Sequence, residues 1–188
     1  MSAAVYVALV HGPVKNKRGD LVTTAVTGLS LHDIARAVVT YGCSGYFLVT
    51  PLEAQKRLVT RMTGHWEGEF GSRYNPNRKQ ALEVVSVVDT LQDAIREVVH
   101  REGVGPEVVA TSARTVEGVA PVSFVELRQR LAAGGPPLLL VFGTGWGLSE
   151  ETVCGMDRLL EPVRGPGAYN HLSVRSAVSI ILDRLLGQ

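Results

Sequence analysis

Short apolar runs alternate with helix-like patterns along this chain, and the alternation constrains the fold more than any other feature. Runs of four to eight apolar residues bounded by turn residues are typical of buried strands. Three strands of this kind are expected, at Val5–Val10, Tyr46–Val49 and Leu138–Phe142, and shorter or less apolar strands are expected at Val108–Ala110 and Leu160–Val163. Apolar strands alternating with helices indicate an α/β protein whose mainly parallel sheet is covered by helices on both faces.

The helices are located from hydrophobic spacing and from residues that favour helix ends. Ser30, with Asp33 three residues later, resembles a capping box, and Pro51 and Ser149 suit helix starts. Between Gly64 and Lys79 apolar residues are few, so a long loop is expected, with a turn at Asn75-Pro76. Gln80–Val88 fits either helix or strand. Helices are expected at Leu31–Tyr41, Thr50–Thr63, Leu91–Glu102, Phe124–Ala133, Glu150–Leu159 and Leu172–Leu186.

Composition limits the possible class of protein. A chain of 188 residues with 45% hydrophobic and 20% charged residues fits one globular domain spanning 1–188. Net charge is +1, so nucleic-acid binding must rest on local patches. Two distant cysteines, Cys43 and Cys154, indicate neither disulfides nor a zinc site. No metal, signal peptide or membrane span is expected, and a cytoplasmic location fits best.

Three loops that follow strands are rich in glycine or small polar residues. They are Thr111–Ala120, Gly143–Gly147 and Arg164–His171. Ligands of open α/β sheets bind at the carboxyl ends of the strands, so these loops predict a small-molecule pocket.

The segment Phe142–Leu148 has glycines at alternate positions between an apolar strand and a helix. It fits either a ligand loop that offers backbone N–H groups or a tight turn, and glycine spacing alone does not choose. Trp146 favours the ligand loop, because an exposed indole is costly unless something covers it. No Lys-Ser or Lys-Thr follows, which excludes a P-loop. A dinucleotide fold is disfavoured because only 41 residues follow Gly147.

The segment Gly165–Ala177 is the second candidate for ligand contact. Asn170 is expected to cap the last helix, whose free N–H groups could bind polar ligand atoms. A cap with no further role is the alternative for Asn170, and His171 fits a partly exposed structural residue equally well.

Sequence runs at both ends of the chain are similar to a known family. LLLVFGTGWGLSEE and GAYNHLSVRSAVSIILDRLLG resemble the C-terminal motifs of the SPOUT, or α/β-knot, methyltransferases. VALVHGPVKNKRGDLVTTAVT and HWEGEFGSRYNPNRKQAL resemble a bacterial subgroup of SPOUT-type RNA methyltransferases related to tRNA guanine-N1 methyltransferase. The resemblance implies a deep trefoil knot within about 108–188, a homodimer, and methylation of a base or ribose in tRNA or rRNA.

The same resemblance implies that three knot loops bind S-adenosylmethionine in a bent form. Recognition in this family is largely by backbone groups. Carried over to this sequence, the cofactor-binding residues are Thr111, Ser112, Ala113, Phe142, Gly143, Thr144, Gly145, Trp146, Gly147, Tyr169, Asn170, His171, Leu172 and Ser173.

No catalytic residue is fixed by the pattern. Proton acceptors or orienting groups are sought among Arg114, His171, His11 and Asp20, and a structural histidine is the competing interpretation of His11. An RNA- or cofactor-binding dimer without methyl transfer is the alternative function, because no catalytic base is evident. A nucleotide-dependent oxidoreductase is disfavoured by chain length.

Two basic clusters are the candidates for RNA contact. Basic residues interleaved with aromatic ones suit an RNA backbone and stacked bases, whereas an ordinary charged loop is the plain alternative. One cluster holds Lys15, Lys17 and Arg18, and the other holds Arg73, Arg78 and Lys79 among the aromatics Trp66, Phe70 and Tyr74.

Overall fold

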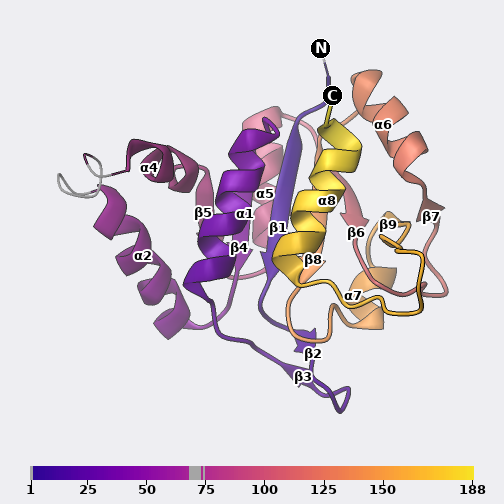
Figure 1. The fold of residues 1–188 in the computed structure, drawn as a ribbon, viewed down its shortest axis with the longest axis horizontal. Helices are drawn as coiled ribbons and strands as arrows, with labels where there is room; N and C mark the ends of the chain where they lie inside the picture. Colours follow the sequence, from indigo (N-terminus) through magenta and orange to yellow (C-terminus); the bar gives the residue numbers. More distant parts are fainter. Residues whose placement is uncertain (1, 68–72, 74) are drawn as a thin grey trace.

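The computed structural model describes residues 2–67, 73 and 75–188. Its centre is a seven-stranded sheet with the order β5-β4-β1-β8-β6-β9-β7, in which every pairing is parallel (Figure 1). The predicted α/β class is therefore confirmed. The strands are β1 (Val5–Val10), β4 (Gly45–Val49), β5 (Val85–Val88), β6 (Glu107–Ala110), β7 (Pro121–Val122), β8 (Leu138–Gly143) and β9 (Arg158–Leu160). A small antiparallel hairpin, β2 (Val14–Lys15) with β3 (Leu21–Val22), lies outside the sheet.

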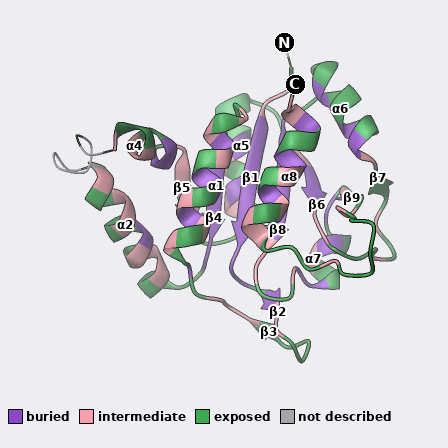
Figure 2. Cartoon of the chain, in the orientation of Figure 1, coloured by how far each residue is buried: buried purple, intermediate pink, exposed green. Residues whose placement is uncertain are grey.

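The central strands are buried along their whole length because helices cover both faces. Every residue of β1 and β4 is buried, and the outer helix surfaces are exposed (Figure 2). This explains why these strands are continuous apolar runs without polar alternation. The helices are α1 (Gly28–Thr40), α2 (Glu53–Glu67), α4 (Pro76–Leu82), α5 (Leu91–Glu102), α6 (Phe124–Ala132), α7 (Glu150–Cys154) and α8 (Val174–Leu186).

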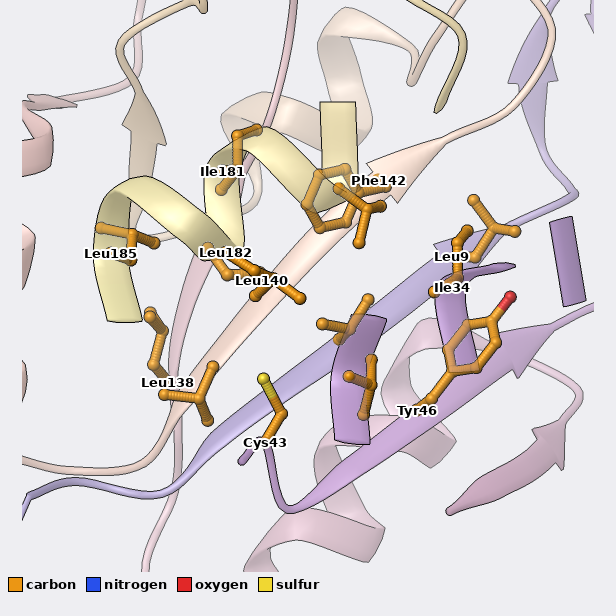
Figure 3. Close-up of a cluster of buried hydrophobic side chains, with 14 of the residues drawn as sticks. Leu9, Ile34, Cys43, Tyr46, Leu138, Leu140, Phe142, Ile181, Leu182 and Leu185 are labelled. Carbon is orange, nitrogen blue, oxygen red and sulfur yellow. The ribbon is translucent and has the colours of Figure 1, made fainter. Parts of the chain in front are cut away.

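Alternate residues of the strands build two core layers. On one face, Val7 and Leu9 of β1 pack with residues of α1 and α8, and on the other, Tyr6 and Ala8 pack with residues of α5 and α7. Figure 3 shows the first layer, in which alternate side chains of β8 meet Ile181, Leu182 and Leu185 of α8. This packing fixes both the register of the strands and the position of α8.

Several predicted helix ends are wrong, because capping depends on backbone geometry that sequence does not fix. Helix α1 begins at Gly28 with Thr27 as its N-cap, so Ser30 is not the cap. Ser173 caps α8, so Asn170 is not the cap either. Helix α7 ends at Cys154, five residues before the predicted end, which leaves room for β9 at Arg158–Leu160.

The long loop predicted at 64–79 is partly wrong. Helix α2 continues to Glu67. Asn75 is the N-cap of α4, with Pro76 at the first helical position, so this pair starts a helix rather than forming a turn. Residues 68–72 and 74, which include the predicted RNA contacts Phe70 and Tyr74, lie outside the described residues. Within the described residues, no helix has both the length and the apolar character of a membrane span.

Candidate functional site

The three predicted loops lie at the carboxyl edge of the sheet. Strands β6 and β8 are neighbours, so the loops that follow them leave the sheet side by side. The segment between β9 and α8 returns to the same edge, where Asn170 donates a hydrogen bond from Nδ2 to the Ala113 carbonyl oxygen at 2.9 Å. The first and third loops are therefore in direct contact.

Two glycines of the second loop are required by its backbone. A Cβ at Gly143 would lie 2.6 Å from the Leu148 nitrogen. Gly145 has a φ of +61°, and a Cβ there would lie 2.9 Å from the Lys15 carbonyl oxygen. The tight-turn interpretation thus explains these two residues. At Gly147, with a φ of +97°, nothing lies within 4 Å of the Cβ position, so the backbone borders open space.

The β2–β3 hairpin is fastened to the second loop. Lys15 donates its backbone N–H to the Gly147 carbonyl at 2.9 Å and accepts the Trp146 N–H at 2.9 Å. The Lys15 ammonium also pairs with Glu150 of α7 at 3.0 Å. The first predicted RNA cluster consequently borders the predicted cofactor loop.

A buried hydrogen-bond network supports the second loop from below. The Thr144 hydroxyl lies 3.0 Å from the Val10 carbonyl oxygen and 2.6 Å from the Thr24 hydroxyl. The Thr24 hydroxyl lies 3.0 Å from Nδ1 of His11. His11 is at the end of β1 and is buried, so the network joins the central strand to the loop.

Nδ1 of His11 is the ring nitrogen that contacts the Thr24 hydroxyl, and Nε2 is buried and has no partner among the described residues. Burial lowers the pKa of His11 to about 4, so the ring is neutral at physiological pH.

Large apolar side chains are exposed on the second and third loops. Trp146 is 55% exposed, Tyr169 79% and Leu172 46%. The rings of Tyr169 and His171 meet edge to face with centroids 5.3 Å apart. Exposed apolar side chains on loops at one sheet edge are consistent with a surface that another molecule covers.

The first loop uses its own polar groups to hold its shape. The Thr111 hydroxyl donates to the Val141 carbonyl at 2.9 Å, and the Ser112 hydroxyl accepts the Arg114 N–H at 3.0 Å. Thr111 and Ser112 are half-buried, while Ala113 and Arg114 are exposed. Within residues 111–114, Arg114 is therefore the one charged group, and it is accessible.

The structure does not bring all the proposed contact residues together. Arg78 and Lys79 lie on α4, which Figure 1 places well away from the β2–β3 hairpin that carries Lys15. Asp20 accepts a hydrogen bond from Asn16 within the hairpin at 3.0 Å. The described residues hold no group of three or more His, Cys, Asp or Glu suited to a metal ion.

Sequence reasoning missed two features. It did not identify Thr24, because the partners of this residue come from distant β1 and β8. It also missed a pocket of about 270 Å³ lined by His32 of α1 and by residues of α2. The spacing of Arg61 and His65, four residues apart on one side of a helix, is the pattern that could have revealed it.

A family model described as SAM-dependent RNA methyltransferase matches residues 4–187, nearly the whole chain. The chain belongs to this family. Membership in the SAM-dependent RNA methyltransferase family agrees with the resemblance of the sequence motifs, because the match covers all three loops.

Curated relatives agree with this family membership. The chain is 44% identical over 183 residues to a tRNA (guanine-N(1)-)-methyltransferase of Nitratidesulfovibrio vulgaris, covering 97% of this chain and 42% of that protein. It is 38% identical to an uncharacterized protein of Aquifex aeolicus, covering 98% of this chain and 89% of that one. The chain thus spans less than half the length of the relative that has a named activity.

Solved structures show the same fold. A probable methylase family protein from Haemophilus influenzae superposes with a TM-score of 0.65 at 18% identity, over 98% of this chain and 66% of that one. A probable methyltransferase from Bordetella pertussis gives 0.64 at 19% identity, over 97% and 94%. The SpoU methyltransferase AviRb of Streptomyces viridochromogenes, in complex with AdoMet, gives 0.58 at 17% identity, over 99% and 60%. The chain therefore has the same fold as these three proteins, in agreement with the predicted α/β class.

Proposed function

We propose that this protein transfers the methyl group of S-adenosylmethionine to RNA, and that the cofactor binds between loops 111–114, 143–148 and 169–173. The observation that carries the proposal is the meeting of these loops at one sheet edge, with Asn170 hydrogen-bonded to Ala113. Family membership supports the cofactor class, and the contact between the first and third loops supports the proposed position.

The residues at this edge fit the cofactor. An adenine ring needs apolar cover, and Trp146, Tyr169 and Leu172 are exposed there. A ligand can approach the backbone of the second loop closely at Gly147, because its Cβ position borders open space. The network of His11, Thr24 and Thr144 holds the second loop in this conformation.

S-adenosylmethionine supplies an electrophilic methyl group attached to a sulfonium. The protein must place the RNA acceptor atom in line with that group and accept any proton the acceptor releases. Arg114 and His171 are exposed on the first and third loops and can meet RNA directly. His11 is buried beneath the second loop, so we assign it a positioning role rather than contact with substrate.

Transfer RNA is the proposed substrate, because the relatives with a named activity act on tRNA. We place part of the RNA on the β2–β3 hairpin, where Lys17 and Arg18 are exposed beside the second loop. A homodimer, a knotted passage of the segment that carries Asn170, and a cytoplasmic location belong to the same proposal.

One observation favours a second candidate function. Among the described residues, the side chains of Arg114 and His171 have no hydrogen-bond partner that would orient them for proton transfer. A dimer that binds cofactor or RNA without transferring methyl groups is therefore the alternative.

Two measurements test the proposal. Calorimetric titration with S-adenosylmethionine should show binding that weakens in Asn170→Ala and is unchanged in Asn77→Ala, an exposed control on α4. Mass spectrometry of tRNA nucleosides from cells with and without the protein should show loss of one methylated nucleoside. Absence of cofactor binding would refute the proposal, and binding without any methylated product would establish the alternative.

A further inference from the structure

A pocket of about 270 Å³ opens between α1 and α2, away from the three loops. Its size suits a single planar group, because sites for drug-sized ligands begin at about 300 Å³. The lining residues are His32, Leu58, Arg61, Met62, His65 and Trp66. None of them belongs to the loops proposed for the cofactor.

Aromatic side chains and the Arg61 guanidinium line this pocket, together with Leu58 and Met62. The Trp66 ring meets His32 edge to face at 6.0 Å and His65 edge to face at 5.2 Å. The Arg78 guanidinium lies over the Trp66 ring, 4.4 Å from its centroid. A cation held against an aromatic wall favours ligands that combine a π-face with negative charge.

The pocket region has unused hydrogen-bonding capacity and positive charge. Nδ1 of His32 and Nε of Arg78 are buried and have no partner among the described residues. Burial lowers the pKa of His32, and the positive charge of nearby Arg78 lowers it further. The ring is therefore neutral and can donate or accept a hydrogen bond. The neighbouring Asp33 is already paired with Arg175 at 2.7 Å, while Arg61 forms no ion pair within the described residues.

We propose that this pocket binds one unpaired nucleotide of the RNA substrate, with its base against Trp66 and its phosphate near Arg61. The inference rests on the proposed function, since it assumes that RNA is the substrate. Unpaired bases of RNA are recognised by stacking on aromatic or Arg planes and by hydrogen bonds to their edges, and the pocket offers both.

The pocket lies away from the three loops, so it would contact a different part of the RNA. Gln55 of α2 accepts the Val26 N–H at 2.7 Å, which fixes α2 to the segment that leads from Thr24 into α1. Figure 1 shows α2 on the far side of α1 from the β2–β3 hairpin and α7. A nucleotide held there would fix the register of the RNA, while the loops carry out the transfer.

The test is a binding comparison with a matched arginine control. The probes are a short RNA duplex with one bulged adenosine and the same duplex with an abasic bulge. Arg61→Ala should weaken binding of the bulged duplex about 5-fold or more, whereas Arg57→Ala, exposed on the same helix, should change it less than about 2-fold. The abasic duplex should bind wild type more weakly than the bulged duplex does, because it lacks the base that would contact Trp66.

Crosslinking locates the contact independently. A 4-thiouridine placed in the bulge should crosslink to α2 residues around Trp66. Equal affinity for the two duplexes, equal effects of the two arginine variants, or crosslinks confined to the β2–β3 hairpin would each overturn the inference. Calorimetry of wild type with S-adenosylmethionine separates the two proposals. Wild type that binds the cofactor but does not discriminate between the two duplexes refutes the pocket alone, and wild type that does not bind the cofactor refutes the proposed function.

Discussion

The buried His11 should make the stability of this protein fall in mild acid. Its pKa is about 4 in the folded protein against an ordinary value of 6.5, because burial disfavours the charged ring. The unfolded chain therefore binds a proton that the native state excludes. This contribution to stability is fully present above about pH 6.5 and is lost as pH falls toward 4.

The size of the effect follows from the two pKa values. They differ by about 2.5, and each pKa unit corresponds to about 1.4 kcal/mol, so the complete contribution is about 3 kcal/mol. Linkage between the two protonation equilibria gives a loss of about 2 kcal/mol at pH 5. Burial also lowers the pKa of His32, so His32 adds to the loss of stability in acid. A variant at His11 is therefore needed to isolate the contribution of His11.

His11→Asn is the discriminating variant, because its amide can form a hydrogen bond with the Thr24 hydroxyl as donor or acceptor but does not titrate. Urea unfolding of both proteins should be measured between about pH 7.5 and 4.5. The free energy of unfolding should fall more steeply in wild type than in the variant, by about 2 kcal/mol at pH 5. Parallel curves over this range, or an NMR titration of His11 near 6.5, would refute the reasoning.

Three further predictions concern the loops, the hairpin and the helices. Gly145→Ala should lower the free energy of unfolding, measured by urea denaturation, by about 1–3 kcal/mol and should weaken S-adenosylmethionine binding. The reason is that Gly145 has a φ of +61° and that a Cβ there would meet the Lys15 carbonyl. Gly64→Ala is the control, because Gly64 lies on α2 with open space around its Cβ position, and it should be neutral or stabilising in the same assay. Lys17→Ala should reduce the salt dependence of RNA binding, measured as the slope of log K against log salt, by about one, and an unchanged slope would remove this residue from the RNA surface. Thr90→Ala removes the capping box of α5 and should cost about 1 kcal/mol in thermal unfolding, with no change in cofactor affinity.

The architecture could be predicted from sequence because the apolar runs of the central strands fit only one kind of structure. Runs such as Leu138–Phe142 are too apolar and too short to be anything other than doubly covered strands, and α5 carries both its cap and its amphipathic pattern in its own residues. Features that depend on distant partners could not be predicted. Strand β9 pairs with two strands that come earlier in the chain, and nothing within Arg158–Leu160 specifies them.

In the candidate site, too, features set by local sequence could be predicted, whereas features set by distant contacts could not. Glycine spacing and a motif resemblance identified the second loop, yet the backbone explains Gly143 and Gly145 through their close contacts with Leu148 and Lys15. Asn170 was selected as a cap, and its real partner is Ala113, 57 residues away. Tertiary contacts decided each of these roles, and local spacing does not encode such contacts.

The central claim is that three loops at one sheet edge form the S-adenosylmethionine site, and a crystal structure of the protein grown with S-adenosylmethionine tests it most directly. The cofactor should lie between residues 111–114, 143–148 and 169–173, with Trp146, Tyr169 or Leu172 less exposed than in the free protein. Cofactor bound elsewhere, or loops that remain empty at saturating cofactor, would contradict this account.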